Sequence, residues 1–183
     1  HGVLPCAIIY GANASGKSNI LKAFHSFRQM ILKSHSVEFG DKGINRFPFL
    51  LDEKFDSEPT KFEASFLIEN IRYDFSVEFS NFEILEENLY SYPEGRKRKL
   101  YERFKDEVTF GTEMRGVKKP LVDFMRKTSL FISTATQNKH PELNKVSEFF
   151  KDIYQSSEVS VEAGFINAIF ARDEIDVRAI RFL

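Results

Sequence analysis

"YGANASGKSN", residues 10–19, is the stretch that decides the fold of this chain. Residues 11–18 match the pattern G-x-x-x-x-G-K-[ST] at each fixed position. The apolar run at residues 6–10 predicts a buried strand, and apolar residues at three- and four-residue spacing predict a helix over residues 16–34. A loop of this type between a strand and a helix indicates a phosphate-binding loop and a P-loop NTPase of the α/β class.

The residue types of the loop fit the chemistry of a bound nucleoside triphosphate. Glycine lets the backbone curve so that its N–H groups point at phosphate oxygens, and the following helix adds a favourable dipole. Lys17 is expected to neutralise the β- and γ-phosphates as a catalytic residue, and the Ser18 hydroxyl is expected to ligate Mg²⁺. The predicted ATP-binding residues are Gly11, Ala12, Asn13, Ala14, Ser15, Gly16, Lys17, Ser18 and Asn19.

The composition narrows the classes of protein to consider. The 183 residues suffice for one domain or a large piece of a bigger one, and 26 Lys plus Arg balance 27 Asp plus Glu. This balance creates no overall attraction to nucleic acid or to an anionic membrane. Cys6 is the single cysteine, and neither a leader nor an apolar run of about 20 residues occurs, so the sequence predicts a cytoplasmic protein without a membrane segment.

The rest of the chain predicts a sheet followed by helices. Apolar residues alternate over 60–68 and 71–79, which predicts a hairpin, and two more strands are expected at 83–92 and 99–104. A short helix at 120–127, a strand at 129–134 ("SLFIST") and an amphipathic helix at 140–156 follow, and 161–183 is expected to be mostly helical. The predicted parts of one partial ATPase domain are the P-loop unit 1–36, the antiparallel β-subdomain 44–112 and the mainly helical 117–183.

Asn13 at the third loop position gives the form G-x-N-x-x-G-K-S, which resembles the ABC-type ATPase heads of the SMC, RecF and OLD-nuclease group. Those heads insert an antiparallel β-subdomain after the P-loop helix, as expected here. The ordered blocks "LPCAIIYGANASGKSNILKAF", "FPFLLDE", "PTKFEASFLIENIRYDFSVEF", "ILEENLY", "KLYERF" and "SLFISTATQN" resemble the AbiLii-like family of AAA/ABC-type ATPases from bacterial abortive infection and other anti-phage systems. This resemblance implies an ATPase that dimerises head to head and works with a toxin or nuclease effector.

ATP hydrolysis by such a head also needs a Walker B carboxylate and, in ABC-type heads, an L-S-G-G-Q-like signature loop. No such signature is found in this sequence. Glu86 and Glu87 alternate like a surface strand, and the run "AIFARDE" at 168–174 ends in Asp173–Glu174 but carries Arg172 where a buried strand should be apolar. In the resembled family, Walker B lies beyond residue 183. We therefore expect this chain to be the N-terminal lobe of a longer ATPase and to hydrolyse ATP negligibly by itself.

Gln137 is the second candidate catalytic residue. In ABC-type heads a glutamine after a strand reaches Mg²⁺ and the attacking water, and Gln137 follows the strand predicted at 129–134. The resemblance therefore makes Gln137 a candidate catalytic and metal-contacting residue. The alternative is an ordinary polar residue in a loop.

Other features have simpler structural interpretations. The basic run "GRKRK" at 95–99 fits a contact to a nucleic-acid backbone, but its acidic neighbours favour a solvated hairpin tip, so a nucleic-acid partner stays unsupported. The histidines have no metal-ligand spacing. The aromatic stripe is the expected core of the sheet, not a base-stacking platform. Its residues are Phe62, Phe66, Tyr73, Phe75 and Phe79.

Three functions stay open at this level. The first is the Mg-ATP-dependent ABC/SMC-like head. The second is a self-contained P-loop kinase whose site is completed by "AIFARDE" or by Arg172, Arg178 and Arg181. The third is a module that binds nucleotide without hydrolysing it.

Overall fold

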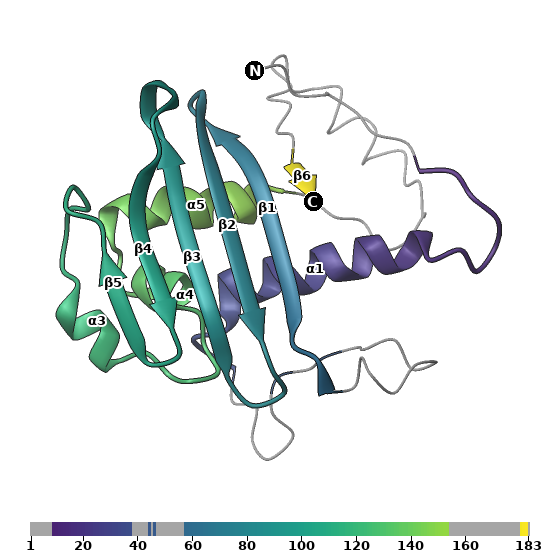
Figure 1. Cartoon of the computed structure of the whole chain (residues 1–183), viewed down its shortest axis with the longest axis horizontal. Coiled ribbons are helices and arrows are strands. Elements are labelled where there is room, and N and C mark those ends of the chain that lie inside the picture. Colours follow the sequence, from purple (N-terminus) through teal and green to yellow (C-terminus); the bar gives the residue numbers. More distant parts are fainter. Residues whose placement is uncertain (1–8, 38–43, 45, 47–56, 154–179, 183) are drawn as a thin grey trace, which may run out of the picture.

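The computed structural model describes residues 9–37, 44, 46, 57–153 and 180–182. A long helix is followed by a sheet and then by further helices (Figure 1). The elements are α1 (Lys17–Lys33), β1 (Thr60–Ile68), β2 (Ile71–Phe79), β3 (Ile84–Tyr92), η2 (Pro93–Gly95), β4 (Arg98–Phe104), β5 (Glu107–Phe110), α3 (Lys119–Asp123), α4 (Phe131–Gln137), α5 (Pro141–Asp152) and β6 (Ile180–Phe182).

The strands form one antiparallel sheet in the order β5-β4-β3-β2-β1-β6. The predicted hairpin of β1 and β2 is confirmed, with Ile68 paired to Ile71 around a two-residue turn. Both turn residues, Glu69 and Asn70, have positive φ (52° and 62°), which matches the right-handed twist of the flanking strands. β3 and β4 also lie where alternation predicts them, whereas β5 was not predicted.

The helices α1, α4 and α5 lie behind the sheet in Figure 1 and cover one of its faces. Aromatic rings fill the space between the two layers. The Phe27 ring of α1 lies 5.6 Å from the Phe75 ring of β2 and 5.8 Å from the Phe150 ring of α5. The rings of Phe66 and Phe149 are stacked at 5.0 Å. The expectation that the aromatic stripe is the sheet's core is therefore confirmed.

Helices α1, α3 and α5 confirm the sequence predictions, but the strand predicted at 129–134 is wrong. That segment turns into α4, which begins at Phe131 and whose first five residues are buried. The amides of Phe131 and Ile132 donate to the Glu87 carboxylate of β3, and the hydroxyls of Thr134 and Thr136 bond back to carbonyls one turn earlier. Long-range capping thus overrides the strand preference of this β-branched segment.

Predictions at the two ends of the chain are only partly covered by the described residues. Residues 6–8 of the strand predicted before the loop lie outside them, and Ile9 and Tyr10 belong to neither helix nor strand. The mostly helical assignment of 161–183 is wrong at Ile180–Phe182, which form β6 beside β1, and residues 161–179 with "AIFARDE" lie outside the described part. None of the described helices combines the length and apolar character needed to cross a bilayer.

Candidate nucleotide-binding site

The phosphate loop, residues 11–18, leads directly into the first turn of α1. Gly16 is the N-cap residue and has φ +89°, a left-handed conformation that favours glycine. Ala14 also has positive φ (63°), and the Ser15 amide donates to the Ala12 carbonyl over 3.3 Å. These conformations curve the loop tightly just before the helix begins.

Gly11, at the other end of the loop, lies close to the Ser15 side chain. A Cβ atom at this position would lie 2.7 Å from the Ser15 hydroxyl oxygen, so any side chain would force Ser15 to move. The two fixed glycines of the motif therefore have different tasks. Gly11 allows a close approach across the loop, and Gly16 allows the backbone conformation that starts α1.

Lys17 places its ammonium group over the beginning of the loop. Its Nζ donates to the carbonyl oxygens of Gly11 and Ala12, at 2.8 Å and 2.6 Å. The charge needed for phosphate recognition is thus held against the concave stretch of backbone that the sequence assigns to the phosphates. These carbonyl contacts are replaceable because the loop residues 11–15 are exposed.

The N-terminus of α1 is open to an anion. The helix has no side-chain cap and no acidic residue in its first turn. Its positive dipole end therefore meets no carboxylate of its own helix, and the exposed Ser18 lies in this first turn. Backbone amides, an ammonium group and a hydroxyl form the donor set expected of a site for a polyphosphate with a divalent cation.

A family model described as "AAA domain, putative AbiEii toxin, Type IV TA system" matches residues 6–179. The chain belongs to this family. Membership makes it an AAA/ABC-like ATPase domain of a family linked to abortive infection, and it indicates a P-loop NTPase that binds ATP. No curated protein and no solved structure matches the chain.

The structure does not bring Gln137 to the phosphate loop of its own chain. Gln137 is the last residue of α4, not a residue after a strand, and it lines a cavity beside His35. His35 follows the C-terminal end of α1, whereas Lys17 begins it. A helix of 17 residues is about 25 Å long, so Gln137 and the loop lie at opposite ends of α1.

The cavity beside Gln137 has a volume of about 130 Å³ and lies where the C-terminal ends of α1 and α4 meet. His35, Phe124, Arg126, Ser129, Thr134, Gln137 and Asn138 line it. Burial and then the Arg126 guanidinium lower the pKa of His35, although a hydrogen bond with Gln137 raises it. Arg126 also donates to the His35 carbonyl, so a cation already caps the negative end of α1.

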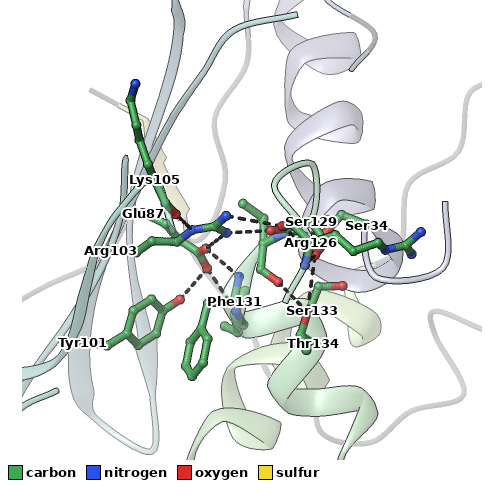
Figure 2. A network of polar contacts seen from close by, with 12 residues as sticks. Ser34, Glu87, Tyr101, Arg103, Lys105, Arg126, Ser129, Phe131, Ser133 and Thr134 are labelled. Atoms are coloured by element: carbon green, nitrogen blue, oxygen red, sulfur yellow. Dashed lines mark hydrogen bonds and ion pairs between the residues drawn. The ribbon is translucent and has the colours of Figure 1, made fainter. Parts of the chain in front are cut away.

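A buried ion pair holds this far end of α1 to the sheet, as Figure 2 shows. Glu87 of β3 and Arg103 of β4 are directly paired in the sheet register, and neither side chain is exposed. The Glu87 carboxylate accepts from the Tyr101 hydroxyl at 2.6 Å and from the amides of Phe131 and Ile132 at 2.6 and 3.0 Å. The sequence interpretation of Glu87 as a surface residue is therefore wrong.

Arg103 satisfies its remaining donors on backbone carbonyls. It donates to Ser129 and Lys105, each at 2.6 Å, and lies 3.4 Å from the Glu87 carboxylate. Burial, and then the neighbouring Glu87 carboxylate, raise the pKa of Tyr101 well above its usual value, so this hydroxyl stays a donor. Every charged atom of the pair thus has a partner, as burial of an ion pair requires.

The same network reaches α1 through two serines. The Ser34 hydroxyl accepts from the Leu130 amide at 3.0 Å, and the Ser133 hydroxyl accepts from the His35 amide at 3.1 Å. Sequence reasoning missed these residues. Strand alternation could have shown that Glu87 and Arg103 face inward, since each lies two residues from an inward-facing residue on its strand (Leu89 and Tyr101).

Proposed function

We propose that this chain is an ABC/SMC-like ATPase head that binds Mg-ATP through residues 11–18. The observation that carries the proposal is the loop itself, in which Lys17 bridges the carbonyls of Gly11 and Ala12 beside an uncapped helix N-terminus. The triphosphate would take the place of these carbonyls as the partner of the Lys17 ammonium. Membership in the AAA family supports ATP as the nucleotide.

The donor set at the start of α1 suits magnesium held mainly by the nucleotide. The described residues contain no cluster of three His, Cys, Asp or Glu side chains that could hold a metal ion by themselves. Mg²⁺ commonly uses one or two protein oxygens together with phosphate oxygens and water. Ser18 supplies such an oxygen, and a bound Mg²⁺ would neutralise phosphate charge as it does in P-loop NTPases generally.

Hydrolysis also needs a Walker B carboxylate. Of the two acidic pairs noted in the sequence, only Glu86–Glu87 lies among the described residues, and it does not fit this role. The Glu87 carboxylate is buried in its ion pair with Arg103 and cannot reach a metal ion, and Glu86 lies on the opposite face of the same strand. We propose that nucleotide binding drives head-to-head dimerisation, and that hydrolysis also requires a Walker B carboxylate and a signature loop, which the described residues do not provide. The family description supports a role in abortive infection, with a toxin or nuclease effector as partner.

Calorimetric titration with Mg-ATP tests the binding step. We expect Lys17→Ala to weaken ATP binding by at least about tenfold, since it removes a charge-assisted contact to phosphate. Lys22→Ala is the matched control, because Lys22 is an exposed lysine further along α1, and it should leave the affinity unchanged. Equal affinities of the wild type and Lys17→Ala would contradict the proposed site.

Steady-state phosphate release then separates the three functions left open by the sequence. The head model expects ATP-dependent dimerisation and little turnover by the chain alone. Rapid turnover by the monomer that is lost in Lys17→Ala would contradict the need for a second head. Phosphoryl transfer to an added small acceptor would identify a kinase instead.

A further inference from the structure

One face of the sheet, named the open face, is covered by none of the described helices. The described helices α1, α4 and α5 lie behind the strands in Figure 1, and none of them lies on the face toward the viewer. Strand alternation sends every second side chain to this open face. On β2 these are Arg72, Asp74, Ser76 and Glu78, because Tyr73, Phe75, Val77 and Phe79 are buried on the other face.

The open face is acidic at one end of the strands and cationic at the other. The acidic half lies where β2 ends and β3 begins, and the cationic half lies where β3 ends and β2 begins. The acidic half contains Glu63, Glu78, Glu86 and Glu107, with Lys61 as its cation, and Glu102 at its boundary is paired at 2.9 Å with Lys99 of the cationic half. The cationic half contains Arg72, Lys97 and Lys99, with Asp74 as its carboxylate and the rings of Tyr90 and Tyr92.

The acidic half contains an unfavourable pair of like charges. Glu78 of β2 and Glu86 of β3 are directly opposite each other in the register. Like charges in that arrangement destabilise a sheet. Lys61 is opposite Glu78 on the other side, but its ammonium group lies 2.8 Å from the Glu63 carboxylate. A further cation from outside the sheet would relieve this repulsion.

The cationic half presents guanidinium and ammonium groups held on aromatic rings. The Arg72 guanidinium lies 3.7 Å from the centre of the Tyr92 ring, and the Lys97 ammonium lies 3.7 Å from the centre of the Tyr90 ring. Arg72 Nε is 3.4 Å from the Asp74 carboxylate and donates no hydrogen bond. Arg72 is therefore oriented in advance, and its side chain is 41% exposed, so the guanidinium can meet a carboxylate from outside the sheet.

We propose that the open face of the sheet is a self-association surface on which a second copy of this chain docks. In the proposed dimer the open faces of the two copies face each other. The two-fold axis lies midway between these faces and is perpendicular to the strands. Arg72 and Glu78 lie three residues on either side of Phe75, the middle residue of β2. This axis therefore places Arg72 of each copy over Glu78 of the other, and the cationic half of each over the acidic half of the other.

The charge pattern favours a second copy of the chain as the occupant, and it favours a two-fold axis perpendicular to the strands. A two-fold axis along the strands would bring acidic half onto acidic half, which costs free energy. A nucleic acid spread over the face would meet the carboxylates of the acidic half. The 38 residues of β1 to β5, at about 3.3 Å per residue and with strands about 4.8 Å apart, present roughly 600 Å², which is somewhat below the roughly 800 Å² per partner of a standard interface.

Charge reversal tests the proposal, measured by sedimentation equilibrium at low salt without nucleotide. The wild type is expected to dimerise with an affinity that falls as salt is added. Arg72→Glu and Glu78→Arg should each weaken dimerisation by at least about tenfold, and the double variant Arg72→Glu/Glu78→Arg should restore it to near the wild-type value. Restoration is diagnostic, because residues 72 and 78 lie about 20 Å apart within one strand and cannot compensate each other there.

Charge reversals outside the open face provide matched controls. Lys119→Glu on α3 and Glu148→Arg on α5 change exposed charges away from the open face and should leave dimerisation unchanged. Circular dichroism and the melting temperature verify folding of each variant. Lys17→Ala should also dimerise normally, because the open face does not use the phosphate loop.

Four outcomes would overturn the proposal. A wild type that stays monomeric at several hundred micromolar, or a double variant that stays as weak as the single ones, would exclude the pairing of Arg72 with Glu78. Dimerisation that requires ATP and is lost in Lys17→Ala would belong to the nucleotide-dependent head contact instead. Binding of a fluorescent single-stranded oligonucleotide that Arg72→Glu abolishes and Glu78→Arg strengthens would identify a nucleic acid as the occupant.

Discussion

The two ends of α1 differ in almost every physical property. At the end that carries the phosphate loop, Ile20 and Leu21 are 47% and 56% exposed, and the first turn has no side-chain cap. At the other end Phe27 and Ile31 are fully buried. Arg28 of the same helix also donates to two carbonyls at the end of α5.

This contrast separates the part of the helix that is proposed to bind nucleotide from the part that packs against the rest of the fold. The polar groups at the far end of α1 hydrogen-bond with the start of α4, with Ser133 of α4 and with the end of α5, so few of them are left for a ligand. The loop end keeps backbone donors, an ammonium group and a hydroxyl accessible. A phosphate site needs that accessibility, and the buried end provides the rigid base from which the loop is presented.

Removal of the Glu87 carboxylate is expected to have the largest effect on stability, because it disrupts the buried network at the C-terminal end of α1. Glu87→Ala leaves the Arg103 guanidinium buried without its anion and removes the acceptor for two amides of α4. The free energy of unfolding should fall by about 3–5 kcal/mol, as for other broken buried ion pairs. Urea denaturation followed by circular dichroism measures this loss.

Glu86→Ala is the matched control for that prediction. Glu86 is the adjacent residue on β3, is exposed, and belongs to the other face of the strand. Its replacement should change the free energy of unfolding by no more than about 0.5 kcal/mol. Similar losses in the two variants would show that the buried network does not hold the far end.

A smaller effect is expected from Gly16→Ala at the loop end. Its φ of +89° is unfavourable for a residue with a Cβ, so the variant should lose about 1 kcal/mol of stability, and its loop should bind Mg-ATP more weakly. Gly95→Ala, at a hairpin tip with φ +78°, should show a similar loss of stability with unchanged ATP affinity. Calorimetry and thermal denaturation of both variants separate backbone strain from nucleotide binding, and equal ATP affinities in the two would contradict a role for Gly16.

The smallest expected effect is the pH dependence of stability that His35 causes at the C-terminal end of α1. The pKa of His35 is lowered in the fold, first by burial and then by Arg126, whereas histidine in an unfolded chain titrates near pH 6.5. Below that pH the unfolded chain binds a proton that the folded chain does not, so the free energy of unfolding should fall as the pH decreases. The loss should stop once the pH passes below the lowered pKa of His35.

His35→Asn isolates this contribution in urea denaturation at pH 7.5 and 5.5. The difference between the two pH values should be smaller in the variant than in the wild type. Some difference should persist, because burial also lowers the pKa of His140. An unchanged difference would mean that His35 titrates alike in the folded and unfolded chain.

The regular parts of the fold could be predicted from local patterns. Alternation predicted β1 to β4, the three- and four-residue spacing predicted α1 and α5, and the aromatic stripe was correctly assigned to the core. The failures share one cause. The segment 129–134 and the residue Glu87 depend on each other across 44 positions in the chain, so neither could be interpreted from its neighbours alone.

The sequence by itself predicted the phosphate loop, because the chemistry of a polyphosphate fixes residue types at short, local spacing. It also determined the hairpins and the amphipathic helices, because these depend on periodicity. Only the tertiary structure decided that residues 131–137 form a helix, that Glu87 and Arg103 are buried together, and that Gln137 lies at the far end of α1. The physical reason is that capping, ion pairing and burial involve groups brought together by packing, and no local pattern encodes those distances.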